Sequence, residues 1–308
     1  MPEILKVQNV MDYAKHLGAK TSHPLVALID YAAISPVPHV LNRYSVYGIF
    51  MHRHLSAELR YGSGKYKKDK GSLLCVAPGQ IGGKEDNGER IHIDGYALLF
   101  HPDILRGSSL AREIRNYSFF DYSTNEALET TEEEFGVISS VMQKIQGELQ
   151  NVRDKYQDKI LLNYIELVLN FCMRFYDRQF AENKPKNQDI LQKFDDLLES
   201  YFTEKAQHEN KLPGISYFAQ ALCMSPHYFS DFIRKVTGNS ASNYIRRYCI
   251  RQAKNQLAEG KSIGEVSSRL GFEYPEHFTR LFKKMTGKTP LAYKKGLCIL
   301  TQDAKLQS

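Results

Sequence analysis

Residues 263–293, IGEVSSRLGFEYPEHFTRLFKKMTGKTPLAY, repeat in altered form residues 215–244, ISYFAQALCMSPHYFSDFIRKVTGNSASNY. The second copy has one inserted residue in its middle. The matched pairs are Ile215/Ile263, Leu222/Leu270, Pro226/Pro275, Phe229/Phe278, Gly238/Gly287 and Tyr244/Tyr293. Internal similarity of this kind indicates one supersecondary unit that is used twice.

Each copy is expected to fold as a helix, a tight turn and a second helix. In the second copy, Ser262 and Glu265 have the spacing of a capping box, which bonds the free amides at a helix start. Gly271 suits the turn, and Pro275 suits the first position of the next helix, where a missing N–H is tolerated. The residues spaced for burial on the two second helices are Phe229, Phe232, Ile233 and Val236, and Phe278, Leu281, Phe282 and Met285. Two helix-turn-helix units are therefore predicted.

The residues opposite each buried stripe are polar. They are His227, Ser230, Asp231 and Arg234 on one helix, and Glu276, Thr279, Arg280 and Lys283 on the other. Arginine pairs with guanine, carboxylates accept from the cytosine amine and hydroxyls bond several bases, so these side chains are candidates for DNA contact. A solvated helix face has a similar composition, but duplication with matched turns favours DNA, whose successive major grooves present two equivalent surfaces.

Charge is distributed unevenly along the chain. Residues 211–308 contain 16 Lys and Arg against 6 Asp and Glu, a net charge of +10, whereas residues 1–210 contain 25 against 29. A strongly basic C-terminal part favours a polyanionic partner. A helix predicted from about 240 to 258 joins the two units, and its basic residues either contact phosphates or are solvated. These are Arg246, Arg247, Arg251 and Lys254.

The C-terminal part resembles the DNA-binding domain of AraC/XylS-type transcription regulators over about residues 190–296. The residues that carry the resemblance are Gly271-Phe272, Phe278, Arg280, Phe282-Lys283-Lys284, Gly287, Thr289-Pro290 and Tyr293. The resemblance implies two recognition helices in successive major grooves of double-stranded DNA, and it adds His277 to the base-reading candidates. Glu276 and Lys294 depart from the family pattern, which affects the preferred DNA sequence, and Tyr274 before Pro275 predicts a weak helix cap.

The rest of the chain has a different pattern. Short apolar runs separated by glycine and proline predict strands within about 20–106, and helical spacing predicts helices within about 107–180. This order is similar to that of family members with a cupin-like sensor domain. We expect a multidomain α+β protein, in which a β-rich cupin-like barrel with following helices precedes an all-α domain. The predicted ranges are 1–180 for the sensor and dimerisation domain, 181–189 for a linker and 190–298 for the DNA-binding domain.

One local pattern has the spacing of a metal site. His52, His54 and Glu58 match the H-x-H-x3-E pattern of metal-binding cupins, since alternate residues share one face of a strand. Surface histidines are the simpler interpretation, because a further histidine is missing shortly after Pro78-Gly79. No catalytic signature is found, so neither an enzyme nor a bound cofactor is expected. The alternative is a cupin-type metal-binding enzyme or sensor with a DNA-binding tail, which metal analysis would distinguish.

The resemblance also implies an effector and a dimer. In such proteins the barrel binds an effector and the following helices mediate dimerisation. The aromatic residues of the β-rich part either line a pocket for a small molecule or fill the core. They are Tyr31, Tyr44, Tyr47, Phe50, Tyr61, Tyr66, Tyr96 and Phe100. The apolar stripe within 160–176 is a candidate homodimer face, or it packs against its own domain.

The expected compartment is the cytoplasm. Five scattered cysteines without a C-x-x-C pair indicate reduced thiols. No run of about 20 apolar residues predicts a membrane span, and the first residues lack the profile of a signal peptide. An activator would also contact RNA polymerase, but activation and repression are not distinguished by the sequence.

Overall fold

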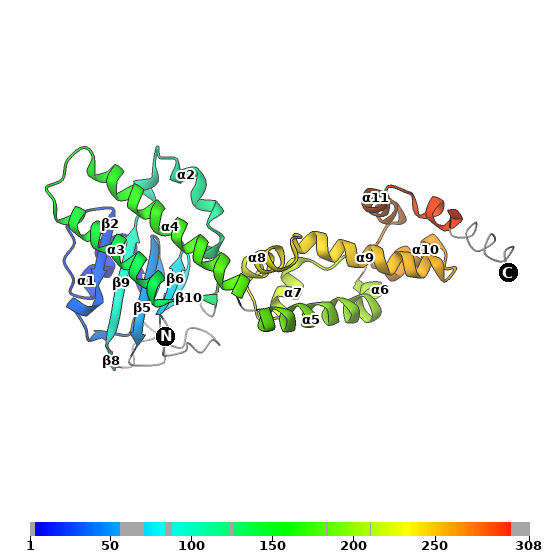
Figure 1. Ribbon diagram of the computed structural model, residues 1–308, viewed down its shortest axis with the longest axis horizontal. Helices are drawn as coiled ribbons and strands as arrows, with labels where there is room; N and C mark the ends of the chain where they lie inside the picture. Colours follow the sequence, from blue (N-terminus) through cyan, green and yellow to red (C-terminus); the bar gives the residue numbers. More distant parts are fainter. Residues whose placement is uncertain are drawn as a thin grey trace. The chain divides into compact units, whose positions relative to one another are not determined.

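A computed structural model describes residues 4–55, 71–83, 88–123, 126–182, 184–209 and 211–296 of the 308-residue chain. The chain divides into two compact units, Met1–Glu182 and Asn183–Ser308; their elements are labelled in Figure 1. The first unit is β-rich and ends in helices, and the described residues of the second unit form helices and their connections. This confirms the predicted order of a β-rich part, helices and a helical C-terminal part. Within the described ranges, no helix has both the length and the apolar character needed to cross a membrane.

The first unit contains three sheets. Its strands are β1 Ile4–Val7, β2 Val26–Asp30, β3 Val37–Pro38, β4 Leu41–Tyr44, β5 Tyr47–Leu55, β6 Gly71–Val76, β7 Ile81–Gly83, β8 Arg90–Ile91, β9 Ile93–Phe100 and β10 Leu128–Thr130. The largest sheet has the order β10-β6-β5-β9-β2 with antiparallel neighbours. The sheets β1-β4-β7 and β3-β8 are smaller. In the described part of the chain these three sheets have no strand in common, and no closed barrel is formed.

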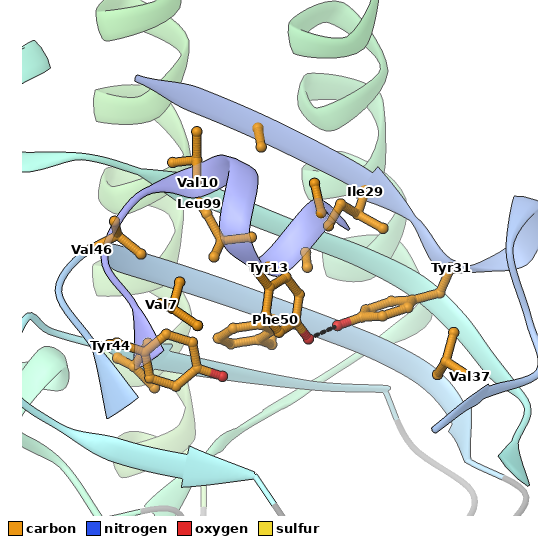
Figure 2. Close-up of a cluster of buried hydrophobic side chains, with 14 of the residues drawn as sticks. Val7, Val10, Tyr13, Ile29, Tyr31, Val37, Tyr44, Val46, Phe50 and Leu99 are labelled. Atoms are coloured by element: carbon orange, nitrogen blue, oxygen red, sulfur yellow. Dashed lines mark hydrogen bonds between the residues drawn. The ribbon is translucent and has the colours of Figure 1, made fainter. Parts of the chain in front are cut away.

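One buried cluster of this unit joins side chains of the first helix and of β1 and β4 to side chains of the large sheet. Helix α1, Val10–His16, starts with a capping box between Asn9 and Asp12 and buries Val10, Tyr13 and Ala14. Figure 2 shows Val10 and Tyr13 among Tyr31, Tyr44, Phe50 and other residues of the cluster. Most of the predicted aromatic residues that are described therefore contribute to the buried core.

Two long helices cover the large sheet, as Figure 1 shows. They are α3, Glu132–Gln150, and α4, Gln157–Glu182. Several α4 residues of the stripe predicted as a candidate dimer face, including Leu161, Ile165, Val168, Leu169 and Cys172, are 0% exposed. Since a single chain already covers these residues, the stripe packs within the protomer. The short helical segments are Tyr31–Ala33, Pro102–Leu105, α2 Leu110–Glu113, Ile114–Asn116 and Ser118–Asp121.

The segment predicted as a linker is largely helical. Helix α4 ends at Glu182 and α5, Lys184–Ser200, begins two residues later, so residues 184–189 belong to a helix. The sequence favoured a linker because of its polar residues and Pro185. The proline lies in the first turn of α5, where a backbone N–H has no intrahelical acceptor, so it does not interrupt the helix.

The second unit is built from short helices around aromatic contacts. After α5 come a π-helical turn Tyr201–Lys205, α6 Ala206–Glu209, α7 Ile215–Ala221, α8 Pro226–Thr237, α9 Ala241–Ala258, α10 Ile263–Arg269 and α11 Pro275–Thr286. Residues 290–296 are also helical. Phe194 of α5 is 0% exposed, and its ring centroid lies 5.0–5.3 Å from those of Phe218, Phe229 and Tyr244. Helix α5 therefore forms part of the core on which the first repeat is built.

Candidate nucleic-acid interface

The first repeat folds as a helix-turn-helix unit made of α7 and α8. Ser225 caps α8, since its hydroxyl accepts from the Tyr228 amide at 3.3 Å, and Pro226 occupies the first helical position. Phe229, Phe232 and Ile233 are buried on one face of α8. Gly238 ends the helix with φ 70°, a left-handed conformation that glycine adopts without strain.

The second repeat gives the same unit from α10 and α11. Ser262 and Glu265 form the predicted capping box at the start of α10. Phe278 and Phe282 are buried on α11. Tyr274 at the start of α11 makes no capping side-chain bond, which confirms the weak cap predicted there. The two recognition helices therefore have equal lengths of 12 residues but differently stabilised starts.

The two turns differ at one matched position. Cys223 precedes α8 with φ 56°, and Gly271 precedes α11 with φ 81°. A Cβ atom added to Gly271 would lie 2.8 Å from the carbonyl oxygens of both Ala206 and Lys211. The second turn therefore lies directly against α6 and the segment that follows it, whereas Cys223 is exposed.

Most of the predicted base-reading side chains lie on the surface. Those exposed to solvent are His227, Arg234, Glu276, His277, Arg280 and Lys283, and those half-buried are Ser230 and Thr279. Asp231 differs, because it is 8% exposed. Helical spacing placed it on the outward face, but spacing takes no account of partners. Its carboxylate bonds the guanidinium of Arg234, three residues further along α8, at 2.5 Å.

Helix α9 connects the two helix-turn-helix units and packs against both of them. It contains 18 residues, which corresponds to a length of about 27 Å, and it packs against α8, α10 and α11. Of its basic residues, Arg247 donates to the side chain of Asn239, and Arg251 and Lys254 lie over the rings of Tyr248 and Tyr293. These three cationic side chains therefore already interact with other groups of the protein.

Lys294 has a role that the sequence did not indicate. Its ammonium donates to the carbonyl oxygens of Gly260 and Lys261, at 2.7 Å in each case. Carbonyls beyond a helix C-terminus lack intrahelical donors, and a cation there is favoured. The departure of Lys294 from the family pattern therefore falls on a contact inside the domain. Only the 33-residue separation of these partners hid the contact from a local sequence pattern.

The predicted metal pattern is only partly described. Glu58 and the side chain of His54 lie outside the described residues. His52 on β5 is buried, and this burial lowers the pKa of its imidazole to about 4. Across the described parts of the chain, His, Cys, Asp and Glu side chains form no group of three that would hold a metal ion. His52 is therefore not one of the surface histidines expected from the sequence, and the metal pattern itself stays a prediction.

A cavity lies in the first unit beside the core of Figure 2. Its volume is about 40 Å³, and Tyr13, Tyr31, His39, Asn42 and His52 are its polar lining residues besides Tyr44. The Asn42 side chain donates to the Val40 carbonyl and the Tyr44 hydroxyl, while its oxygen is buried without a hydrogen-bond partner among the described residues. A buried acceptor without a donor is unfavourable by about 1–3 kcal/mol.

Comparison with known proteins agrees with this geometry. Residues 218–296 match a family described as a helix-turn-helix domain. The HTH-type transcriptional regulator YobQ of Bacillus subtilis is 40% identical over 73 residues, 23% of this chain and 30% of that protein. The arabinose operon regulatory protein of Escherichia coli is 34% identical over 83 residues, 27% of this chain and 28% of that protein. The chain thus spans less than a third of either relative.

A solved structure aligns over a longer range but less closely. ToxT from Vibrio cholerae aligns with 89% of this chain and 98% of that chain, at 15% identity and a TM-score of 0.29. A TM-score of this size supports no conclusion about the N-terminal unit.

The two repeats, their turns and the joining helix define a tandem helix-turn-helix domain. With the family match, the C-terminal unit contains a helix-turn-helix domain of the AraC type, and the relatives that share it are named as transcriptional regulators. The resemblance predicted from the sequence is therefore confirmed for this domain. The cupin-like character of the N-terminal unit stays a prediction.

Proposed function

We propose that this protein is a sequence-specific transcription regulator that binds double-stranded DNA through α8 and α11. The observation that carries the proposal is the pair of helix-turn-helix units, each with exposed polar side chains on its second helix. One helical turn of DNA separates successive major-groove entries by about 34 Å. Helix α9, which joins the two helix-turn-helix units, is of comparable length at about 27 Å. The basic residues of the C-terminal part supply salt-dependent affinity for phosphates.

The proposed target is asymmetric. The outward residues of α8 and α11 differ in type at each matched position, as at Asp231 and Arg280 or Arg234 and Lys283. Since different side chains select different bases, the two halves of a monomer's site have different sequences. The residues proposed to contact DNA remain those predicted from the sequence, except that Asp231 acts through Arg234.

Arg280→Ala and Lys283→Ala are expected to have different effects on DNA binding. Arg280→Ala weakens binding to the cognate site by about 1–3 kcal/mol and relaxes preference at one base position, because a bidentate base contact is lost. Lys283→Ala weakens binding to all DNA sequences alike, because one phosphate contact is lost. It also reduces the slope of log affinity against log salt concentration by about 1. Fluorescence anisotropy at several salt concentrations, on a site selected from random DNA and on a scrambled site, measures both effects.

Lys159→Ala provides the matched control, since this exposed lysine belongs to α4 in the other unit. It should leave both the salt slope and the base preference unchanged. If Arg280→Ala also left affinity and base preference unchanged, the assignment of this residue to the major groove would be refuted.

We further propose that the first unit, in a homodimer, regulates the second, and that an activator form contacts RNA polymerase. The ranges 1–180 and 190–298 are retained for the sensor and DNA-binding domains. The proposed dimer cannot use the buried α4 stripe, which leaves the outward residues of α4. Among these, Leu167 and Met173 are about 40% exposed. A protein that acts on DNA in this way belongs in the cytoplasm.

The cavity is the proposed effector site, and its lining restricts the effector. Among the described lining residues no Asp, Glu, Lys or Arg occurs, and burial keeps His52 neutral at physiological pH. The unpaired Asn42 oxygen requires a donor. The site therefore fits a small uncharged molecule that carries an N–H or O–H group, in agreement with the limited volume.

Acetamide and acetone test this assignment, because they are similar in size but only acetamide has N–H donors. Acetamide is expected to raise the thermal midpoint of the full chain, since a ligand that binds only the folded state stabilises it. Acetone should have no such effect, and Asn42→Ala should remove the response to acetamide. The control Asn163→Ala changes an exposed residue of α4 and should respond like the wild type. Equal midpoints with both compounds, or an unchanged response of Asn42→Ala, would exclude the Asn42 oxygen as the recognition group.

A further inference from the structure

Helix α8 carries a buried carboxylate, that of Asp231. The Arg234 side chain is 62% exposed, while that of its partner Asp231 is 12% exposed. The bond runs from Nη2 of the guanidinium to Oδ1 of the carboxylate, between residues three positions apart, which face each other on a helix. The cation is thus held at a fixed place on the helix and still presents most of its surface to solvent.

The matched pair on α11 has the opposite electrostatic character. Asp231 corresponds to Arg280 and Arg234 corresponds to Lys283 in the repeat. The α8 pair therefore has no net charge, whereas the α11 pair carries two positive charges. Both α11 residues are exposed. Because attraction to phosphates depends on net positive charge, the α8 pair attracts a phosphate less than the α11 pair does.

The hydroxyl hydrogen of Ser230 on α8 is already used within the helix. Its hydroxyl donates to the Pro226 carbonyl at 2.7 Å, one turn earlier in the helix. The hydroxyl therefore offers lone pairs to a partner outside the helix, whereas the Arg234 guanidinium offers N–H donors. A guanidinium has five N–H donors in a rigid fork, so one bond to Asp231 leaves others free for the O6 and N7 atoms of guanine.

We propose that Asp231 is a positioning residue that directs Arg234 to a guanine in the major groove instead of to a phosphate. This deepens the proposed function and rests on it. The carboxylate limits the rotamers of Arg234 and repels phosphate oxygens near its head group. Arg234 is then a specificity-determining residue of the first half-site, and its partner makes no base contact of its own.

Two variants of the full chain test the role of Asp231. Asp231→Asn removes the charge but keeps an acceptor, and Asp231→Ala removes both. Either variant frees Arg234 to neutralise a phosphate, so the slope of log affinity against log salt becomes steeper by about 0.9 and binding to scrambled DNA strengthens. Discrimination against replacement of one guanine falls by about tenfold in Asp231→Ala and by less in Asp231→Asn. Substitution of that guanine by 7-deazaguanine identifies the N7 contact.

A merely structural role would not produce this combination, because it would weaken binding to cognate and scrambled DNA together. Glu199→Gln is the matched control, since it removes an exposed carboxylate from α5 of the same unit and should leave discrimination at that guanine unchanged. In an Arg234→Ala background, Asp231→Ala should cause no further loss of discrimination. Thermal midpoints of all variants verify that the unit is folded.

The two possible failures are distinguishable. If the wild type binds its selected site and both Asp231 variants keep the wild-type salt slope and guanine preference, the positioning role is wrong and the proposed function stands. If the wild type shows no salt-dependent binding to any duplex, the proposed function itself fails.

Discussion

Replacing Gly271 with alanine is expected to destabilise the second helix-turn-helix unit by about 2–4 kcal/mol. The new methyl group would lie 2.8 Å from two backbone carbonyl oxygens, those of Ala206 and Lys211, and neither belongs to a flexible side chain. The backbone at φ 81° adds strain for any residue with a Cβ atom. Hydrogen exchange of the full chain should show faster exchange over residues 263–293, and binding to the selected DNA site should weaken.

Cys223→Gly is the matched control in the first repeat. Cys223 already occupies the left-handed region at φ 56°, and its side chain is exposed. Glycine relieves this strain but increases the entropy of the unfolded chain, so the expected change is a stabilisation of at most about 1 kcal/mol. If Gly271→Ala were as harmless as Cys223→Gly, the close approach of the second turn to α6 and the segment after it would be disproved.

Phe194→Ala is expected to destabilise the second unit by about 3–5 kcal/mol. The ring is fully buried, and it contacts aromatic side chains from α7, α8 and α9. Its loss leaves a cavity that none of these rings can fill without leaving its own position. Chemical denaturation of the full chain, followed by helical circular dichroism, should show the second unit unfolding at lower denaturant concentration.

Two further variants distinguish the cavity from other causes. Phe194→Leu retains most of the volume and should be considerably less destabilising. Tyr244→Phe removes only the hydroxyl that donates to Asp195 at 2.9 Å, with an expected effect of about 1 kcal/mol. Equal stability of Phe194→Ala and the wild type would show that α5 is not part of the core of the first repeat.

Much of the C-terminal domain could be predicted because its signals are local. The capping box of Ser262 and Glu265, the turn at Gly271 and the end of α8 at Gly238 each depend on residues within one or two helical turns. The apolar spacing of the recognition helices also identified most of their buried residues. Strands β5, β6 and β9 likewise correspond to apolar runs seen in the sequence.

The remaining features depend on contacts between distant residues. Phe194 lies in a segment of ordinary helical composition, and its importance comes from rings 24–50 residues away. Most of the predicted linker is helical, because Pro185 lies at a helix start, where proline does not break the helix. Whether the strands close into a barrel depends on pairings across the sheet, which no run of residues encodes by itself.

The continuous helix α9 has a consequence for how the protein would search a chromosome. Two DNA-binding units joined by a flexible linker each lose conformational entropy when they bind. Helix α9 instead fixes the two helix-turn-helix units relative to each other when the chain folds. Under the proposed function, the second groove is therefore engaged without a further loss of entropy. A DNA segment with only one correct half-site would be released quickly. Helix α9 thus sets the spacing at which both half-sites are tested in a single encounter.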